Sequence, residues 1–306
     1  MQKKYELTNN TIVKFGRTLY QIKALFSFDV VSKGDFGGYI EKEENLSQDG
    51  NAWVFGNAWV FGDARVYGDA RVFDDARVYD DACVYGNTRV FGNACVSDSA
   101  WISGGAWVYG NAIVSGNAKV YGSACVYGDA RVYGNARVYG SAWVSGNAMV
   151  SDSAWISGDA EIYGNARVSG DAWVYGNAWV SGDARVYDNA RVYGDARVYD
   201  DARVHGNAWV SGGAWVYGNA CVSGDARVYR NTDFLLIGKI GSRAAFTTFF
   251  KNKSAGITVA CGCFLGTIAE FRAKVKETHG NNKHAKMYNL AADMAELQIL
   301  GDKSEV

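Results

Sequence analysis

The chain has 306 residues and a formal net charge of −1 at pH 7, which excludes a protein that binds nucleic acids or anionic membranes through its overall charge. It contains no run of about 18 consecutive apolar residues, so no membrane span is predicted. The first six residues lack the apolar core of a secretory signal, and the six cysteines are scattered along the chain. We therefore expect reduced thiols and a cytoplasmic protein.

Residues 1–36 contain short runs typical of β-strands, at residues 5–7, 11–15 and 18–22, with turn signals between them. They precede a long repeat array, and such arrays need a segment that covers their open first unit. The sequence therefore predicts an N-terminal β cap over residues 1–36, followed by degenerate repeats up to residue 50.

Thirty six-residue repeats run without interruption from Asn51 to Arg230. The repeat reads Asn or Asp, Ala, a variable residue, Val, an aromatic residue or Ser, and Gly or Asp; only Thr88 replaces the Ala. Side chains alternate along an extended segment, so Ala and Val point inward and the variable residues outward. The Gly-Asn or Gly-Asp step supplies a corner. Each repeat therefore buries its apolar face against stacked copies of itself.

An aliphatic residue with a small residue four places on, as in Val138 and Ala142, resembles the hexapeptide-repeat superfamily. The resemblance implies a left-handed parallel β-helix with three repeats per coil, and so ten coils over residues 51–230. With strands about 4.8 Å apart, the array would be about 45 to 50 Å long. One series of tryptophans recurs every 36 residues, which is twice the length of an 18-residue coil and so supports it. These residues are Trp107, Trp143, Trp179 and Trp215.

The residues from 232 to 306 predict a small α+β domain. Two β-prone runs, residues 245–250 and 256–261, predict a hairpin. Thr267 and Glu270 form a capping box, which opens a helix that ends before Gly280. A second helix is predicted over residues 283–300. The β-helix itself is assigned to residues 37–231.

Four segments outside the regular repeats resemble a closer family, the phage and prophage hexapeptide-repeat proteins, with an enterobacterial relative described as an acyltransferase. These segments are residues 34–41, 240–243, 261–267 and 276–280. The resemblance implies a phage-related origin and no established activity.

Acyl transfer from acetyl-coenzyme A is the first functional hypothesis, because many hexapeptide-repeat enzymes use a histidine base for it. His205 is the candidate, since it occupies an outward repeat position that otherwise holds Tyr, Phe or Ser. Such enzymes usually carry a loop extruded from the coils, and this array has none. The alternative is that His205 is one more surface ring.

An arginine ladder is the second candidate. On an 18-residue coil, Arg167, Arg185 and Arg203 lie on consecutive coils of one face. Their repulsion requires counter-charges, which Asp183 and Asp201 could supply, or else an anionic ligand. Over residues 51–230 there are 14 basic and 18 acidic residues, so we do not expect nucleic-acid binding.

The outward tryptophans named above are the third candidate. A large exposed apolar area usually marks an interface, which favours self-association as a trimer or dimer. Aromatic rows also stabilise a sheet through stacking, and a flat row of Trp would suit sugar rings.

Cys261, Cys263, His279 and His284 are a fourth candidate, because two Cys and two His form a familiar zinc set. One residue between the cysteines is an unusual spacing for zinc. Cys263 could instead be a reactive thiol before a helix N-terminus, or both cysteines could simply be small buried side chains.

Together these observations predict an all-β solenoid with a cap and an α+β domain. The expected function is that of a non-catalytic binding or structural protein of phage origin, without a cofactor. It would present its aromatic and arginine ladders to a host or phage protein, as an anti-defence factor or a virion component. The alternative is an acyltransferase that uses acetyl-coenzyme A.

Overall fold

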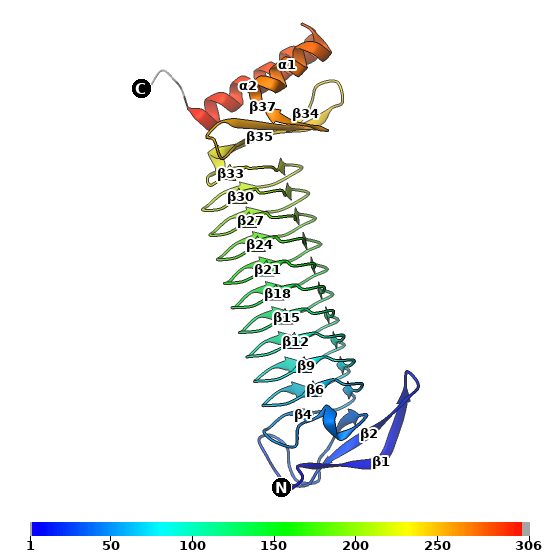
Figure 1. Cartoon of the computed structure of the whole chain (residues 1–306). Coiled ribbons are helices and arrows are strands. Elements are labelled where there is room, and N and C mark those ends of the chain that lie inside the picture. Colours follow the sequence, from blue (N-terminus) through cyan, green and yellow to red (C-terminus); the bar gives the residue numbers. More distant parts are fainter. Residues whose placement is uncertain (1, 302–306) are drawn as a thin grey trace. The chain divides into compact units, whose positions relative to one another are not determined.

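The computed structural model describes residues 2–301 and consists of two compact units, one ending at Gly164 and the other beginning at Asn165 (Figure 1). The boundary lies inside the repeat array, where each coil contacts only its neighbours. The division into residues 1–36, 37–231 and 232–306 stays a prediction.

In the first unit, each hexad forms a two-residue strand at its third and fourth positions. These strands are β4 (Trp53–Val54), β5 (Trp59–Val60), β6 (Arg65–Val66), β7 (Arg71–Val72), β8 (Arg77–Val78), β9 (Cys83–Val84), β10 (Arg89–Val90), β11 (Cys95–Val96), β12 (Trp101–Ile102), β13 (Trp107–Val108), β14 (Ile113–Val114), β15 (Lys119–Val120), β16 (Cys125–Val126), β17 (Arg131–Val132), β18 (Arg137–Val138), β19 (Trp143–Val144), β20 (Met149–Val150), β21 (Trp155–Ile156) and β22 (Glu161–Ile162).

The second unit continues the same pattern. Its repeat strands are β23 (Arg167–Val168), β24 (Trp173–Val174), β25 (Trp179–Val180), β26 (Arg185–Val186), β27 (Arg191–Val192), β28 (Arg197–Val198), β29 (Arg203–Val204), β30 (Trp209–Val210), β31 (Trp215–Val216), β32 (Cys221–Val222) and β33 (Arg227–Val228).

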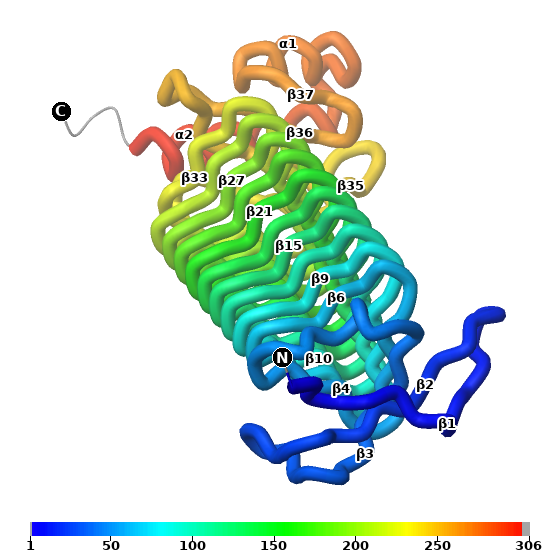
Figure 2. Tube along the Cα trace, turned by 60° about the horizontal axis from the view of Figure 1, so that its bottom comes forward, coloured from blue at the N-terminus to red at the C-terminus, as the bar shows by residue number. Residues whose placement is uncertain are grey.

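Within each unit, a strand pairs in parallel with the strand three places further along the chain. Arg89 of β10 lies opposite Trp107 of β13, and Arg185 of β26 lies opposite Arg203 of β29. Every third strand therefore belongs to the same sheet, and Figure 2 shows the coils of each unit stacked on one another. The parallel β-helix and its 18-residue coil are confirmed; the left hand of the coil stays a prediction.

The interior of the coils is made of the Ala and Val positions of the repeat. In a typical hexad Ala136 and Val138 are both fully buried. Burying a Val side chain contributes about 1.5 to 3 kcal/mol relative to leaving it exposed, and every hexad repeats this gain. The narrow interior explains why the second position admits nothing much larger than Ala.

The corners depend on a left-handed backbone at the sixth position. Gly140 has φ of 71°, and a Cβ there would lie 2.9 Å from the backbone nitrogen of Gly158 on the next coil. Aspartate is the residue that replaces glycine here, as at Asp98 with φ of 55°. Its carboxylate accepts a hydrogen bond from the Gly116 N–H of the next coil at 2.8 Å, which offsets the backbone strain.

Thr88, the one repeat residue that replaces the inward Ala, is fully buried, and its hydroxyl has no hydrogen-bond partner among the described residues. We expect Thr88→Val to raise the free energy of unfolding by about 1 to 2 kcal/mol, because it removes an unsatisfied buried hydroxyl at constant volume. Thr248→Val is the matched control. The Thr248 hydroxyl, also buried, accepts from the Cys221 N–H at 3.0 Å, so that substitution should destabilise. Chemical denaturation of both variants tests the prediction; equal signs would contradict it.

The N-terminal cap is built from a hairpin and a third strand. β1 (Tyr5–Lys14) and β2 (Arg17–Ala24) are antiparallel, with a register shift between Leu7 and Thr11. β3 (Phe36–Ile40) pairs antiparallel with β2 and parallel with β5, which joins the hairpin to the first coils. The predicted short runs at residues 5–7 and 11–15 thus belong to one strand.

The cap must supply hydrogen-bond donors, because each coil donates its N–H groups to the next coil, as Trp53 does to the Ala70 carbonyl at 3.0 Å. The carbonyl groups of the first coil therefore receive no hydrogen bond from an earlier coil. The buried Lys4 ammonium donates to the Ala52 carbonyl at 2.9 Å, and burial lowers the pKa of this lysine to about 8. Asn45, in the short helix η1 (Glu43–Asn45), donates to the Ala64 carbonyl at 2.8 Å.

The opposite end needs acceptors, because the last coil leaves N–H groups unpaired. Asp233, in the short helix η2 (Asn231–Asp233), accepts from the N–H groups of Tyr229 and Arg230, both at 2.9 Å. The side-chain oxygen of Asn231 accepts from the Trp215 N–H at 2.7 Å. The two ends of the array thus carry opposite hydrogen-bonding chemistry.

The C-terminal domain is an antiparallel sheet with two helices. Its strands are β34 (Phe234–Ile240), β35 (Ala245–Lys251), β36 (Ile257–Cys261) and β37 (Phe264–Thr267), and its helices are α1 (Ile268–His279) and α2 (Lys283–Leu300). The predicted hairpin and both helices are confirmed, while the edge strands β34 and β37 were not predicted. In the second unit this sheet lies between the last coils and the helices (Figure 1). No helix of the described residues is long and apolar enough to cross a membrane.

Candidate functional site

The arginine ladder exists as predicted. Arg167, Arg185 and Arg203 are direct partners on the adjacent strands β23, β26 and β29, and all three side chains are exposed. None of the three guanidinium groups forms an ion pair or a hydrogen bond within the described residues. The ladder is therefore an uncompensated row of positive charge at strand spacing, about 4.8 Å.

The expected screening of the ladder by aspartates is not found. The Asp183 carboxylate accepts from the Asn165 side-chain amide at 3.0 Å, and in the described chain neither Asp183 nor Asp201 forms an ion pair. Corner residues 18 apart pair with each other in this way, so their side chains run along the corner and not toward the sheet face. The neighbouring ring of Tyr187 stacks on His205.

The predicted tryptophans do not form a continuous row. Trp107 and Trp143 lie on β13 and β19, with Cys125 of β16 between them. In the other unit, Trp179 and Trp215 lie on β25 and β31 on either side of Arg197. Of the four, Trp143 is the most exposed, at 49%.

Arginines cover several of the tryptophan faces. The Arg197 guanidinium lies 4.5 Å from the ring centroid of Trp179 and 4.9 Å from that of Trp215. Arg191 bridges Trp173 and Trp209 in the same way, at 5.0 and 5.1 Å. Such cation–π contacts stabilise the sheet by about 0.5 to 1 kcal/mol at exposed sites. The ring faces they cover are unavailable to a sugar.

The fifth position of the repeat builds columns of stacked rings. In the first unit Phe73, Phe91, Tyr109 and Tyr127 stack in succession, with centroids 4.8 to 4.9 Å apart and planes within 3° of parallel. Each good aromatic pair contributes about 0.5 to 1.5 kcal/mol beyond its buried area. Much of the aromatic surface thus stabilises the coils.

His205 is part of such a column. Its ring stacks on Tyr187 at 4.7 Å, and its Nε2 lies 3.5 Å from the Cys221 sulfur. On the other side, Nδ1 lies 3.8 Å from an Asp188 carboxylate oxygen. Although this order of groups resembles a catalytic triad, burial lowers the pKa of His205 and raises that of the Cys221 thiol, so both are kept neutral.

The same packing recurs where no histidine is present. The Tyr79 hydroxyl lies 3.3 Å from the Cys95 sulfur, with the same sequence separation of 16 residues as His205 and Cys221. A fifth-position ring that leans over the third-position residue of the next coil is therefore a general feature of the array. The geometry favours the interpretation of His205 as one more ring.

The Cys and His residues considered for zinc all lie in the C-terminal domain. Among the described residues, no three His, Cys, Asp or Glu side chains are grouped so that they could hold a metal ion. The Cys261 sulfur accepts from the Thr247 hydroxyl at 3.2 Å, and the rings of His279 and His284 are 5.8 Å apart. Cys263 is exposed, but Glu270 already occupies the N-terminus of α1 by accepting from the Thr267 N–H at 2.7 Å.

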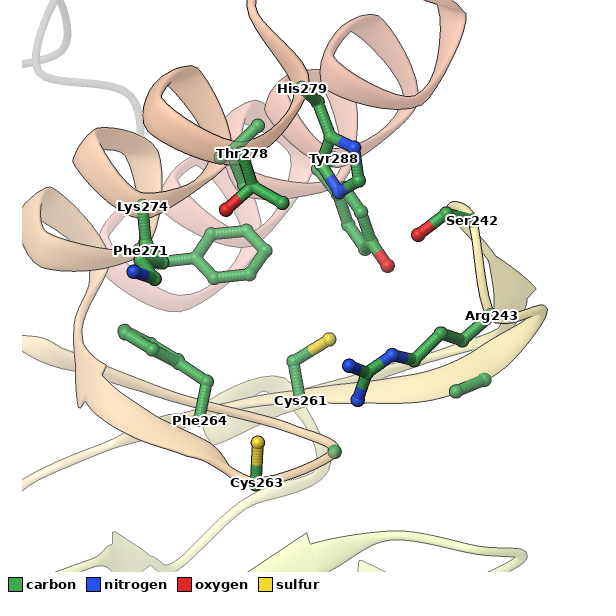
Figure 3. A pocket seen from close by; sticks show the side chains of 13 residues that line it. Ser242, Arg243, Cys261, Cys263, Phe264, Phe271, Lys274, Thr278, His279 and Tyr288 are labelled. Atoms are coloured by element: carbon green, nitrogen blue, oxygen red, sulfur yellow. The ribbon is translucent and has the colours of Figure 1, made fainter.

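Three of these residues line a cavity of about 400 Å³, which we call the C-terminal cavity (Figure 3). It is enclosed by the turn between β34 and β35, the end of β36 with the turn that follows, and both helices. Its lining residues are Ser242, Arg243, Ala245, Cys261, Gly262, Cys263, Phe264, Phe271, Lys274, Val275, Thr278, His279 and Tyr288. Sequence reasoning did not find this cavity, although residues 240–243, 261–267 and 276–280, singled out in the sequence, contribute to it.

Fold and repeat geometry together define this protein as a parallel β-solenoid. The family model described as the YdcK beta solenoid repeat matches within the array, at residues 64–78, 130–146, 142–158, 160–176, 184–198 and 196–212. No curated protein matches the chain.

Proposed function

We propose that this protein is a non-catalytic binding protein of phage origin, whose solenoid presents the arginine ladder to an acidic surface of a protein partner. The observation that carries the proposal is the row of three exposed guanidinium groups without counter-charges. Arg191 and Arg197 lie over tryptophan rings, whereas the three ladder arginines have no such contact among the described residues and are available to a partner.

Electrostatics supports a partner with a matching row of carboxylates. Adjacent ladder charges about 5 Å apart repel by about 1 kcal/mol in water, and this repulsion is present in the free protein. Carboxylates that approach the ladder would relieve it and form bidentate hydrogen bonds with the guanidinium groups. Trp215, 41% exposed, lies on a different sheet of the coils from the ladder, so the proposal rests on the charges and not on apolar contacts at the ladder itself.

A protein fits these features better than the other ligand classes considered. Acidic residues outnumber basic ones in the array, 18 to 14, which disfavours nucleic acid. Carbohydrate binding would need free tryptophan faces, and arginines cover both faces that flank Arg197. The partner would be a host or phage protein, met in the bacterial cytoplasm or in the virion.

The alternative function, acyl transfer from acetyl-coenzyme A, gains no specific support. In both units the strands recur every six residues, without an extruded loop that could enclose a substrate. His205 is stacked in a ring column and is kept neutral by burial. Affinity purification of the tagged protein from its bacterial host, compared with a ladder variant and with His205→Ala, separates the two functions. A partner captured by the wild type and His205→Ala but not by the ladder variant supports binding.

We also propose that the protein forms a homo-oligomer, a dimer or trimer, and that α2 carries the contact. Four apolar side chains at spacings of three and four lie on one exposed stripe of this helix. They are Met287, Leu290, Met294 and Leu297, which are 40%, 63%, 56% and 62% exposed. Leu290, Met294 and Leu297 are each more exposed than any of the tryptophans considered for self-association.

Substitution of the stripe should produce a monomer. We expect native mass spectrometry to show an oligomer for the wild type and a monomer for Leu290→Glu/Leu297→Glu, because two carboxylates cannot be buried in an apolar contact. Lys276→Glu/Lys283→Glu, at exposed positions outside the stripe, is the control and should remain oligomeric. A wild-type monomer would contradict the proposal.

A further inference from the structure

The C-terminal cavity has the lining of a site for an anion. Arg243 and Lys274 contribute two permanent positive charges from separate elements, the β34–β35 turn and α1, and no acidic residue lines the cavity. In the described structure the Arg243 guanidinium has no ion-pair or hydrogen-bond partner. Figure 3 shows its side chain extending from the turn toward Cys261, along the wall of the cavity.

Hydroxyl groups add donors beside these charges. Within the described chain, the hydroxyls of Ser242 and Thr278 have no hydrogen-bond partner, and Figure 3 shows the Tyr288 hydroxyl directed toward Ser242. Burial raises the pKa of Tyr288, so its phenol stays protonated at neutral pH and can donate. Lys274 does form an ion pair with Glu277 at 3.0 Å, but both side chains are exposed and such pairs contribute little.

The cavity also has an aromatic wall, on the same side as Lys274 (Figure 3). Phe271 packs against Phe264 with ring centroids 5.6 Å apart, and against Tyr288 edge-on at the same distance. The His279 ring stacks on Tyr288 at 5.7 Å. A flat ring can pack on such a wall, and a cavity of about 400 Å³ lies in the range of small-molecule sites.

Local backbone features hold these groups in place. Gly241 has φ of 74°, and a Cβ there would overlap the Tyr288 hydroxyl. Gly262 has φ of 59°, with the Arg243 guanidinium 3.9 Å from where its Cβ would be. Gly241 therefore leaves room for the Tyr288 side chain, whereas a Cβ at position 262 would make only ordinary van der Waals contact with Arg243.

We propose that the C-terminal cavity binds a small phosphate monoester that carries an aromatic or heteroaromatic ring, such as a nucleoside monophosphate. A phosphate monoester offers about two negative charges and three acceptor oxygens, which match two cations and several donors better than one carboxylate does. The ring would lie against Phe264 and Phe271. The proposal is independent of the arginine ladder, so either can fail without the other.

Isothermal titration calorimetry of the full-length protein tests the proposal with four probes: adenosine monophosphate, adenosine, inorganic phosphate and benzoate. Adenosine monophosphate should bind, and each of the other three should bind at least tenfold more weakly. Arg243→Gln should weaken adenosine monophosphate binding by about tenfold or more, because a charge-assisted hydrogen bond is lost. Thr278→Trp, on the exposed side of α1, should fill the cavity and abolish binding.

Lys276→Gln is the matched control, because it removes an exposed charge from the same helix outside the cavity. It should leave the affinity unchanged, and circular dichroism should show all variants folded. The proposal is overturned if adenosine monophosphate does not bind, if benzoate binds as tightly, or if binding survives Thr278→Trp. An equal loss in Lys276→Gln would likewise overturn it, since it would indicate nonspecific charge attraction.

Discussion

Asp233→Ala is expected to lower the free energy of unfolding of the last coils by about 2 to 5 kcal/mol. The Asp233 side chain is 1% exposed and accepts from two backbone N–H groups, those of Tyr229 and Arg230. Alanine would leave both N–H groups without a partner at the buried end of the array, at about 1 to 3 kcal/mol each. Hydrogen exchange at these two amides, with thermal unfolding followed by circular dichroism, measures the effect.

Two further variants separate capping from other effects of the substitution. Asp233→Asn keeps an acceptor oxygen at the same place and should lose less than half as much stability as the alanine variant. Asp201→Ala makes the same change at an exposed corner and should stay within about 0.5 kcal/mol of the wild type. If Asp233→Ala left the protection of the two amides unchanged, the capping role of Asp233 would be wrong.

Charge reversal of the arginine ladder should have the largest effect on partner binding. We expect the triple variant Arg167→Glu/Arg185→Glu/Arg203→Glu to weaken binding by about a hundredfold or more, because loss of a charged pair at an interface costs about 2 to 5 kcal/mol. Glutamate is compatible with the fold at this repeat position, since Glu161 occupies it in another coil. Three carboxylates also repel one another as three guanidinium groups do, so stability should change little.

A control of equal charge change distinguishes the ladder from general electrostatics. Lys253→Glu/Lys276→Glu/Lys283→Glu reverses three exposed cations outside the coils. This variant should bind the partner within about threefold of the wild type, apart from a slower association at low salt. Equal losses in both triple variants would show that net charge, and not the ladder, determines binding.

The regular parts of the fold were predictable because the sequence repeats them. An inward Ala and Val in every hexad require stacking, and the 18-residue coil follows from the resemblance and the tryptophan spacing. Helix α1 was predicted to the residue, since Thr267 and Glu270 at one end and Gly280 at the other are local signals. Local signals of this kind need no knowledge of distant contacts.

The cap contacts and the candidate functional sites were less predictable because they depend on contacts between residues that are distant in the sequence. The cap donors Lys4 and Asn45 lie outside the regular repeats, and only the direction of the ladder hydrogen bonds reveals their role. The covering of Trp179 by Arg197 follows from an 18-residue separation, which the sequence could have shown once the coil was known. Arg243 and Lys274 are 31 positions apart, and only the packing of α1 on the sheet brings them to one cavity.

The most direct test of the proposed function is quantitative affinity purification from the bacterial host, with the wild type, the arginine ladder variant and the lysine control analysed in parallel by mass spectrometry. The account predicts one stoichiometric acidic partner, retained by the wild type and the lysine control and lost from the ladder variant. Equal recovery of the partner by the ladder variant would contradict it, and co-purified coenzyme A in place of a protein would favour the acyltransferase.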